Sequence, residues 1–385
     1  MEITLTRYGE LALKKGNRKY FEKVLVQNIK AKLPKANIQR QTGRIFCEVD
    51  LPKEEIIAIL SKIPGITSFS FATRVERDFT AIKDKWFEIL SSNPELRSFD
   101  NFKFESKRAD KSFEIHSDEL SKLLAEDMIQ KFPEFAGKVK LKDPDMTFYT
   151  EIRHDFAYLF TERFKGVGGL PVGTAGKALA LLSGGIDSPV ASYMIMKRGM
   201  KVDFIYFHAY PFTPEQSKEK VLELARILTK YEIKSRMFVI PFTEIQTEIR
   251  RSTDPRYLTL LMRRAMMKIA SEIGKSYKYD ALITGEALSQ VASQTIKSMI
   301  CSNEQSELFV LRPLIGFDKE ETVAIAKKIG TYETSILPYA DCCSLFVPPN
   351  PIIKPDLSDV VAVERNLNAS LLIEKAIGEK EIIDI

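Results

Sequence analysis

Several features are scarce or missing in this 385-residue sequence, and each absence narrows the possible class of protein. Its four cysteines are too few for a disulfide scaffold in a chain of this length, so we expect each thiol to be reduced unless it is catalytic. No apolar run approaches the roughly 20 residues of a membrane-spanning helix. Residues 1–7 also lack the apolar centre of a signal peptide, and we therefore expect a cytosolic, cytoplasmic protein.

A large surplus of charge of one sign is also missing, because the net charge is only +5. The distribution is more informative: through residue 44 the sequence has eleven Lys and Arg against three Glu, and the rest has 46 basic against 49 acidic residues. Such a basic start is typical of a solvated helix face, and equally of a surface that binds a phosphate backbone. Charge alone leaves both interpretations open.

Two familiar phosphate-binding strings are absent as well. Neither a Walker loop nor the dinucleotide fingerprint comes after a predicted strand. Between the apolar run 178–182 and a helix predicted over 189–198 lies a different string, Ser183-Gly184-Gly185-Ile186-Asp187-Ser188. Glycines permit close approach of an anion, helix-start N–H groups point at it, and Ser183 and Ser188 add hydroxyl donors.

Asp187 is the unusual member of this loop. A carboxylate beside bound phosphates repels them unless a divalent cation bridges the two, so Asp187 predicts a nucleotide loaded with Mg²⁺. An ordinary capped strand-to-helix turn would explain the glycines and serines but not the whole string.

Hydrophobic periodicity predicts three structural domains and a linker. Residues 1–75 give a βαββαβ order, typical of a ferredoxin-like α+β domain, and 76–168 give a second α+β domain with a helix over 117–131. A glycine-rich linker spans 169–176. In 177–385 apolar strands alternate with helices, which predicts a doubly wound parallel sheet whose strand ends bind ligands. The chain should end in a helix over about 360–377.

The loop is similar to that of the N-type ATP pyrophosphatases, which cleave ATP between its α and β phosphates. Together with Arg163-Phe164-Lys165-Gly166 to Gly173, Thr284-Gly285-Glu286 to Thr295 and Asp341-Cys342-Cys343, it makes the whole chain resemble the tRNA 4-thiouridine synthetase family. The resemblance implies a ferredoxin-like domain, a THUMP-type RNA-binding domain and an ATP pyrophosphatase domain. It also implies conversion of uridine 8 of tRNA to 4-thiouridine, and in some members a sulfur role in thiamine biosynthesis.

The same resemblance implies roles for particular residues. Asp187 would hold Mg²⁺ and Lys319 would stabilise charge on the phosphates, although an ordinary surface lysine explains Lys319 equally well without the family. ATP would contact Leu181, Leu182, Ser183, Gly184, Gly185, Asp187, Ser188, Tyr206, Phe207, Arg263, Gly285 and Gln294. Contacts to tRNA would come from Lys107, Arg108 and Arg153, with Lys14, Lys15, Arg18 and Lys19 adding backbone attraction.

Sulfur transfer needs a nucleophilic thiol. Cys47 alternates with apolar residues and is expected in the core, Cys301 is undecided, and family alignment favours Cys343 as catalytic with Cys342 as runner-up. Longer members carry a rhodanese domain whose cysteine pairs with the catalytic one, whereas this sequence reaches Ile385 without it. We therefore expect a cysteine desulfurase or another sulfur donor to load Cys343 directly, or free sulfide to be used, with Cys301 or an external thiol resolving any disulfide.

Two rival functions share some of these features. An adenylating amidotransferase or ligase acting on a small molecule would use the same loop, and an RNA-binding protein that senses ATP would use the same domains. The family resemblance also implies a homodimer.

Overall fold

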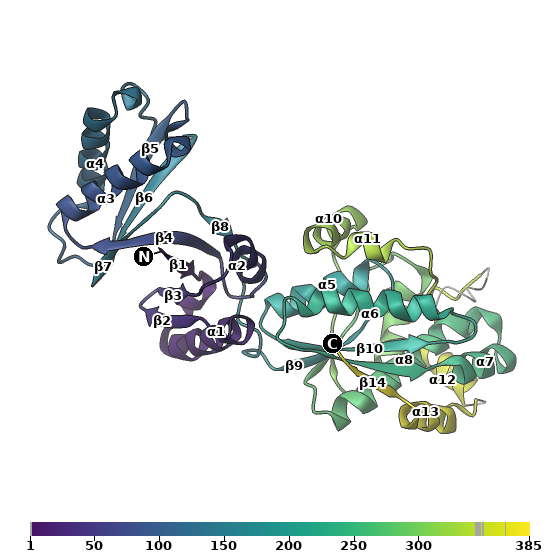
Figure 1. The fold of residues 1–385 in the computed structure, drawn as a ribbon. Helices are drawn as coiled ribbons and strands as arrows, with labels where there is room; N and C mark the ends of the chain where they lie inside the picture. The colour runs from purple at the N-terminus through teal and green to yellow at the C-terminus, as the bar shows by residue number, and fades with distance from the viewer. Residues whose placement is uncertain (1, 343–347, 349, 366) are drawn as a thin grey trace. The chain divides into compact units, whose positions relative to one another are not determined.

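The computed structural model describes residues 2–342, 348, 350–365 and 367–385, except for the side chain of Lys15. The chain forms two compact units (Figure 1). One contains Met1–Lys15, Ile29–Ser61 and Ile66–Gly168, and the other contains Gly16–Asn28, Lys62–Gly65 and Gly169–Ile385. Over the described residues, every helix is too short or too polar to cross a bilayer.

The first unit is built on one eight-stranded sheet in the order β2-β3-β1-β4-β7-β6-β5, with β8 paired to β4. Its strands are β1 (Glu2–Arg7), β2 (Asn37–Gln41), β3 (Arg44–Glu48), β4 (Ser68–Glu76), β5 (Phe102–Arg108), β6 (Met146–Ile152), β7 (Phe156–Phe160) and β8 (Phe164–Lys165). Pairing is antiparallel except between β5 and β6. The predicted division after residue 75 therefore falls inside a strand, because β4 pairs with β1 and then with β7.

The first four strands and the helices α1 (Arg18–Lys32) and α2 (Lys53–Leu60) have the βαββαβ order expected from the sequence. In β1, Ile3 and Leu5 alternate toward one face and pack with Phe46 of β3 in a buried cluster. The ferredoxin-like prediction for this segment is confirmed.

A helix that the sequence analysis missed, α3 (Phe79–Ser92), lies in the second half of this unit beside α4 (Ser117–Lys131). Its N-cap Asp78 accepts hydrogen bonds from two backbone amides, and Ile82, Trp86 and Leu90 share its buried face. Trp86 is fully buried and donates from Nε1 to Thr150 Oγ1 at 3.0 Å. This indole anchors the aromatic core between the helices and β5, β6 and β7.

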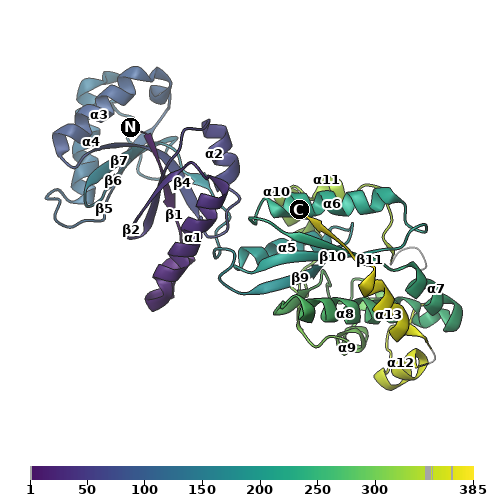
Figure 2. The same cartoon turned by 60° about the horizontal axis from the view of Figure 1, so that its bottom comes forward.

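The second unit has three layers, with helices on both faces of a six-stranded sheet (Figure 2). The sheet order is β13-β12-β9-β10-β11-β14, from β9 (Lys177–Leu181), β10 (Lys201–His208), β11 (Arg236–Pro241), β12 (Ala281–Ile283), β13 (Phe309–Leu311) and β14 (Glu381–Asp384). The first five strands run parallel, as expected, but β14 pairs with β11 antiparallel. The parallel sheet predicted from the sequence is confirmed for its five strands, and the antiparallel edge strand β14 was not predicted.

One face of the sheet carries α5 (Asp187–Lys197), α6 (Glu215–Thr229), α10 (Lys319–Ile329) and α11 (Tyr332–Ser335). The other face carries α7 (Thr243–Ser252), α8 (Leu258–Ser276), α9 (Ile296–Asn303), α12 (Leu357–Glu364) and α13 (Ala369–Gly378). The single helix predicted over 360–377 is therefore two helices, α12 and α13.

Candidate active site

The candidate site begins with the loop between β9 and α5, where an apolar buried strand turns directly into a helix. The loop is stabilised from within: Ser183 N–H donates to Ser188 Oγ at 2.9 Å, and the two hydroxyl oxygens lie 3.1 Å apart. Gly185 N–H donates to Ser183 Oγ at 3.4 Å. The serine hydroxyls that the sequence analysis assigned to phosphate thus also hold the loop in shape.

Gly285, at the end of β12, lies against the first turn of α5. A Cβ on Gly285 would come within 2.6 Å of the backbone N of Ser188 and 2.8 Å of its Cα, which no side chain tolerates. Glycine at this position lets the end of β12 lie directly against the start of α5.

Two residues singled out independently in the sequence contact each other. Lys319 Nζ lies 2.7 Å from Asp187 Oδ1, and Gln290 Nε2 donates to Asp187 Oδ2 at 2.8 Å. Lys319 begins α10, which is fixed by a capping box between Asp318 and Glu321. The structure therefore places a carboxylate and an ammonium side by side at the start of α5.

The wall facing the loop is organised by Glu286, which is almost fully buried. Its carboxylate accepts hydrogen bonds from Arg263, from Arg312 Nε at 2.8 Å and from Thr284 Oγ1 at 2.8 Å. Burial alone would raise the pKa of Glu286, but the positive charges of Arg263 and Arg312 outweigh it and hold the pKa below its usual value. Two guanidinium groups around one carboxylate leave this wall with a net positive charge.

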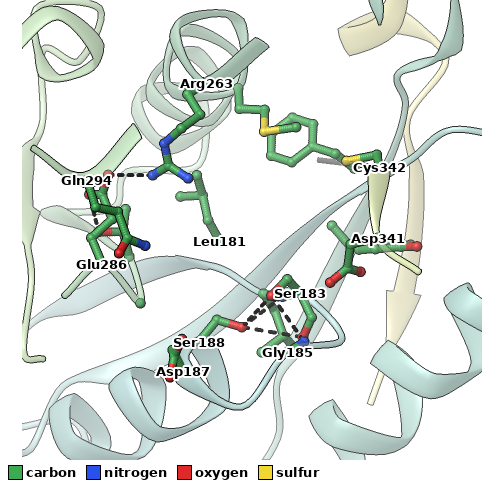
Figure 3. Close-up of a pocket in the computed structure, with 16 residues that line it drawn as sticks. Leu181, Ser183, Gly185, Asp187, Ser188, Arg263, Glu286, Gln294, Asp341 and Cys342 are labelled. Atoms are coloured by element: carbon green, nitrogen blue, oxygen red, sulfur yellow. Dashed lines mark hydrogen bonds and ion pairs between the residues drawn. The ribbon is translucent and has the colours of Figure 1, made fainter. Parts of the chain in front are cut away.

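These elements enclose a cavity of about 210 Å³ (Figure 3). Figure 3 shows Arg263, Glu286 and Gln294 together on one side, and Asp341 beside Ser183 and Gly185 on the other. Of the residues proposed from sequence to contact ATP, all except Gly184 line the cavity, namely Leu181, Leu182, Ser183, Gly185, Asp187, Ser188, Tyr206, Phe207, Arg263, Gly285 and Gln294. The cavity joins segments more than 150 residues apart in the sequence.

Three important residues were not assigned a role from the sequence. Glu286 follows the fourth predicted strand, so its position at the strand ends was expected but no role was given to it. Asp341 stood inside a quoted motif next to Cys342, and nothing in its spacing showed that it enters the cavity wall. Arg312 comes directly after β13, and its position at a strand end was the available signal. All three are charged residues whose neighbours come from distant parts of the chain.

The cysteines differ in environment. Cys47 is buried, as expected for the core, and burial raises the pKa of its thiol to about 11. Cys301, left undecided from the sequence, lies buried inside α9, where burial also raises its pKa. Cys342 is buried and lines the cavity. Cys343, the favoured catalytic residue, lies outside the described residues.

The side chains near Asp187 are compatible with Mg²⁺ only if the ion is bound mainly by the phosphates of a nucleotide. Within the described part of the chain, no group of three or more His, Cys, Asp and Glu side chains could hold a metal ion. Mg²⁺ that binds through one carboxylate and the phosphates of a nucleotide needs no such cluster, and the oxygens of Asp187 suit it. The protein residues therefore fit a cation brought in with ATP.

The residues expected to contact tRNA are placed differently from one another. Lys107 and Lys19 are exposed, and Arg18 pairs with Glu22 at 2.7 Å. Arg108 donates to Phe113 O at 2.6 Å, and Arg153 is largely buried and donates to Thr42 O at 2.6 Å. Lys14 is half-buried, and the side chain of Lys15 is outside the described part. Arg108 and Arg153 are therefore held by the fold itself.

Fold and site together define a nucleotide-binding domain of the ATP pyrophosphatase type that accompanies ferredoxin-like and THUMP domains. Family models match accordingly: the ThiI ferredoxin-like domain over residues 3–70, the THUMP domain over 76–162 and the thiamine biosynthesis protein (ThiI) over 173–369. The chain belongs to the ThiI family of tRNA sulfurtransferases.

Relatives and solved structures agree with this assignment. A probable tRNA sulfurtransferase of Acetivibrio thermocellus is 44% identical, covering 100% of this chain and 99% of the relative. A second probable tRNA sulfurtransferase, from Brevibacillus brevis, is 43% identical, covering 100% of this chain and 96% of the relative. The crystal structure of a 4-thiouridine synthetase in complex with RNA and bound ATP is 35% identical, covers 100% of both chains and superposes with a TM-score of 0.90.

Proposed function

We propose that this protein uses ATP to convert uridine 8 of tRNA to 4-thiouridine. The observation that carries the proposal is the cavity at the loop after β9, which brings the loop, Asp187 and the Arg263 wall together. It is supported by the similar structure that was solved with RNA and ATP.

The chemistry can be argued from the groups involved. Oxygen is a poor leaving group from a uracil ring, so O4 first attacks the α-phosphate of ATP, pyrophosphate leaves, and AMP remains on the base. A sulfur nucleophile then displaces AMP. Loop amides, Lys319 and Arg263 stabilise the negative charge that develops on the phosphates. When bound, Mg²⁺ supplies further charge neutralisation next to Asp187.

The sulfur carrier is proposed to be Cys343, which a cysteine desulfurase loads as a persulfide. In the alternative route, free sulfide attacks the adenylated base directly. A resolving role for Cys301 fits poorly with its burial in α9, because thiol exchange requires access. We therefore favour an external thiol as the resolving group, and Cys342 remains the alternative carrier since it lines the same cavity.

Mass spectrometry of tRNA nucleosides after incubation with ATP, Mg²⁺ and sulfide tests the proposal. We expect 4-thiouridine at position 8 with the native protein. Asp187→Asn should form none, and Cys343→Ser should form none with a persulfide donor. If Cys343→Ser kept full activity with every donor, the carrier assignment would be wrong. If AMP were released at the same rate with and without tRNA, the result would instead favour a small-molecule ligase.

The tRNA surface is proposed to include the basic residues of the first 20 positions. Replacing Lys14 and Lys19 by Glu should weaken tRNA binding and flatten the dependence of its log K on log salt concentration, because fewer counterions are released. Replacing Lys327 and Lys328 by Glu, which changes the charge by the same amount at exposed positions without an assigned contact, is the control. An unchanged salt slope would reject the assignment.

Cytoplasmic location, a homodimer and a sulfur role in thiamine biosynthesis are also proposed, from the family alone. Light scattering at micromolar concentration checks the dimer, and growth of a deletion strain without thiamine checks the sulfur role.

A further inference from the structure

Asp341 occupies an unexpected position, because its carboxylate lies on the phosphate-binding loop. Both carboxylate oxygens accept from the backbone N–H of Gly184, at 3.1 and 3.0 Å. Figure 3 shows the Asp341 side chain directed toward the loop beside Ser183 and Gly185. A backbone N–H at a strand-to-helix turn is the group that such loops offer to an anion. Here an anion of the chain itself is bound there.

A phosphate and a carboxylate cannot share this position. One N–H cannot hold two anionic groups at once, because two anions at hydrogen-bond separation repel each other strongly where little water screens them. We propose that Asp341 occupies the anion position at Gly184 in the nucleotide-free protein and leaves it when ATP binds, so that Asp341 sets the affinity for ligands with phosphates. This inference rests on the proposed use of ATP at the loop.

The backbone around Asp341 is fixed, so the movement belongs to the side chain. Ser217 Oγ donates to Ala340 O at 3.0 Å, and Gln246 Nε2 donates to Cys342 O at 2.9 Å, and both donors are buried. Rotation about the side-chain bonds of Asp341 vacates the Gly184 N–H while these two hydrogen bonds remain.

Energetics favour an exchange of anions at this position. Burial raises the pKa of Asp341, although the Gly184 hydrogen bond and the charge of Lys220 act in the other direction. Burial thus disfavours the charged carboxylate more than these two neighbours favour it. A triphosphate carries more charge and more acceptor oxygens, so it is the stronger occupant of the same position.

Lys220 keeps a positive charge beside the position after the exchange. Its Nζ donates to Leu337 O at 2.8 Å, and its Cδ and Cε lie 3.2 Å from where a Cβ of Gly184 would stand. The ammonium group is therefore held by a backbone carbonyl next to Gly184, independently of Asp341, and balances the charge of an incoming phosphate.

Isothermal titration calorimetry with ATP and Mg²⁺ tests the inference on the full chain. If Asp341 fills the anion position in about nine-tenths of the molecules, Asp341→Ala lowers the Kd for ATP about tenfold, and Asp341→Asn lowers it less because its carbonyl can still accept. Adenosine, which has no phosphate, binds all three proteins equally. Glu333→Gln removes one negative charge from an exposed position on the preceding helix and leaves every Kd unchanged.

Each outcome supports or overturns the inference. Weaker ATP binding by the Asp341 variants would overturn it and make Asp341 part of the nucleotide site, and an unchanged Kd would also overturn it. Equal gains for ATP and adenosine would mean that the whole pocket had changed, and would overturn the inference too. Equal adenosine affinity shows that the variants are folded. Failure of the native protein to bind ATP would reject the proposed function as well, whereas failure of the variants alone rejects only this inference.

Discussion

Each unit of the protein contains a buried glutamate that contacts two or more arginines, and the two clusters differ in an instructive way. In the first unit Glu151 meets three guanidinium groups, with Arg44 Nε at 2.8 Å, Arg153 Nε at 3.6 Å and Arg7 at 3.9 Å. In the second, Glu286 meets Arg263 and Arg312 at the wall of the cavity. Desolvation and the positive charges of Arg44 and Arg163 lower the pKa of Arg7 to about 10, although the negative charge of Glu151 acts in the opposite direction.

The comparison teaches that a buried carboxylate can serve either the fold or the site. Around Glu151 the three arginine side chains are 10 to 13% exposed, and the cluster ties β1, β3 and β6 together. Around Glu286 one arginine, Arg263, also lines the cavity, so the carboxylate holds a cation at the cavity wall. Substitutions at the two glutamates should separate these roles.

The largest effect is expected for Glu151→Gln. Removing this charge leaves three partly buried guanidinium groups without their carboxylate and should lower the free energy of unfolding by about 4 kcal/mol. Urea denaturation measures the change. ATP affinity, measured by calorimetry at 25 °C, should remain near that of the native protein, and a large loss of ATP affinity in folded protein would contradict the division of roles.

Glu286→Gln should act on the site as well as on stability. We expect a loss of about 3 kcal/mol in stability and, because Arg263 is no longer held, a decrease of about 100-fold in tRNA-dependent AMP formation. Binding of tRNA should not change. Partial recovery with Glu286→Asp would support a positioning role, whereas loss of tRNA affinity would argue against it.

Gly285→Ala tests whether the wall carrying Glu286 must lie against the loop. The added methyl group would be within 2.6 Å of Ser188 N, so the start of α5 must shift, and we expect the KM for ATP to rise about tenfold. Gly316→Ala is the matched control, since a Cβ there meets nothing within 4 Å. Equal effects of the two substitutions would show that the close approach is unimportant.

A third buried carboxylate, Glu232, has no arginine among the neighbours that shift its pKa and should show the smallest effect. Burial raises its pKa to about 8, while the Val202 N–H acts in the opposite direction. Because the pKa is raised, the contribution of Glu232 to stability is fully present below about pH 4.5, its unfolded pKa. It is lost as the pH rises through about 8. Glu286, with its lowered pKa, loses its contribution only as the pH falls below its unfolded value of about 4.5.

Melting curves between pH 5 and 9 check this contrast. Glu232→Gln should raise the stability at pH 9 by about 1 kcal/mol, or about 2–4 °C in Tm, with little effect at pH 5. If the Tm of the native protein did not fall between pH 7 and 9, ionisation of Glu232 would not lower stability and the prediction would be wrong. The same conclusion would follow if the variant showed no gain at pH 9.

The sequence predicted the parts of this molecule that depend on local pattern. The loop at Ser183, the parallel strands and the boundaries of α4 can all be read from apolar periodicity or from a short motif. The helix α3 was missed because its signal, Asp78 before Ile82, Trp86 and Leu90, lies in a segment rich in charge. The antiparallel pairing of β14 is not encoded in its four residues alone, since direction depends on which edge is open.

Only the part of the candidate site that lies in a local motif could be predicted from the sequence. Glycine and serine in a motif indicate a loop, but the contacts of Glu286 with Arg263 and Arg312, and of Asp341 with Gly184, join residues from 23 to 157 positions apart. Such pairs are set by tertiary packing. The pairing of Asp187 with Lys319 was equally invisible, although each residue had been chosen separately.

The last strand has a practical consequence. β14 covers the outer edge of β11, and Ile385 N donates to Ser235 O at 2.9 Å beyond the end of that pairing. Trimming the chain after Lys380 would expose the hydrogen-bonding groups of an apolar strand, Met237 to Ile240, to any other polypeptide. The shortened protein should then be lost through self-association during purification, well before any defect in its chemistry could be measured.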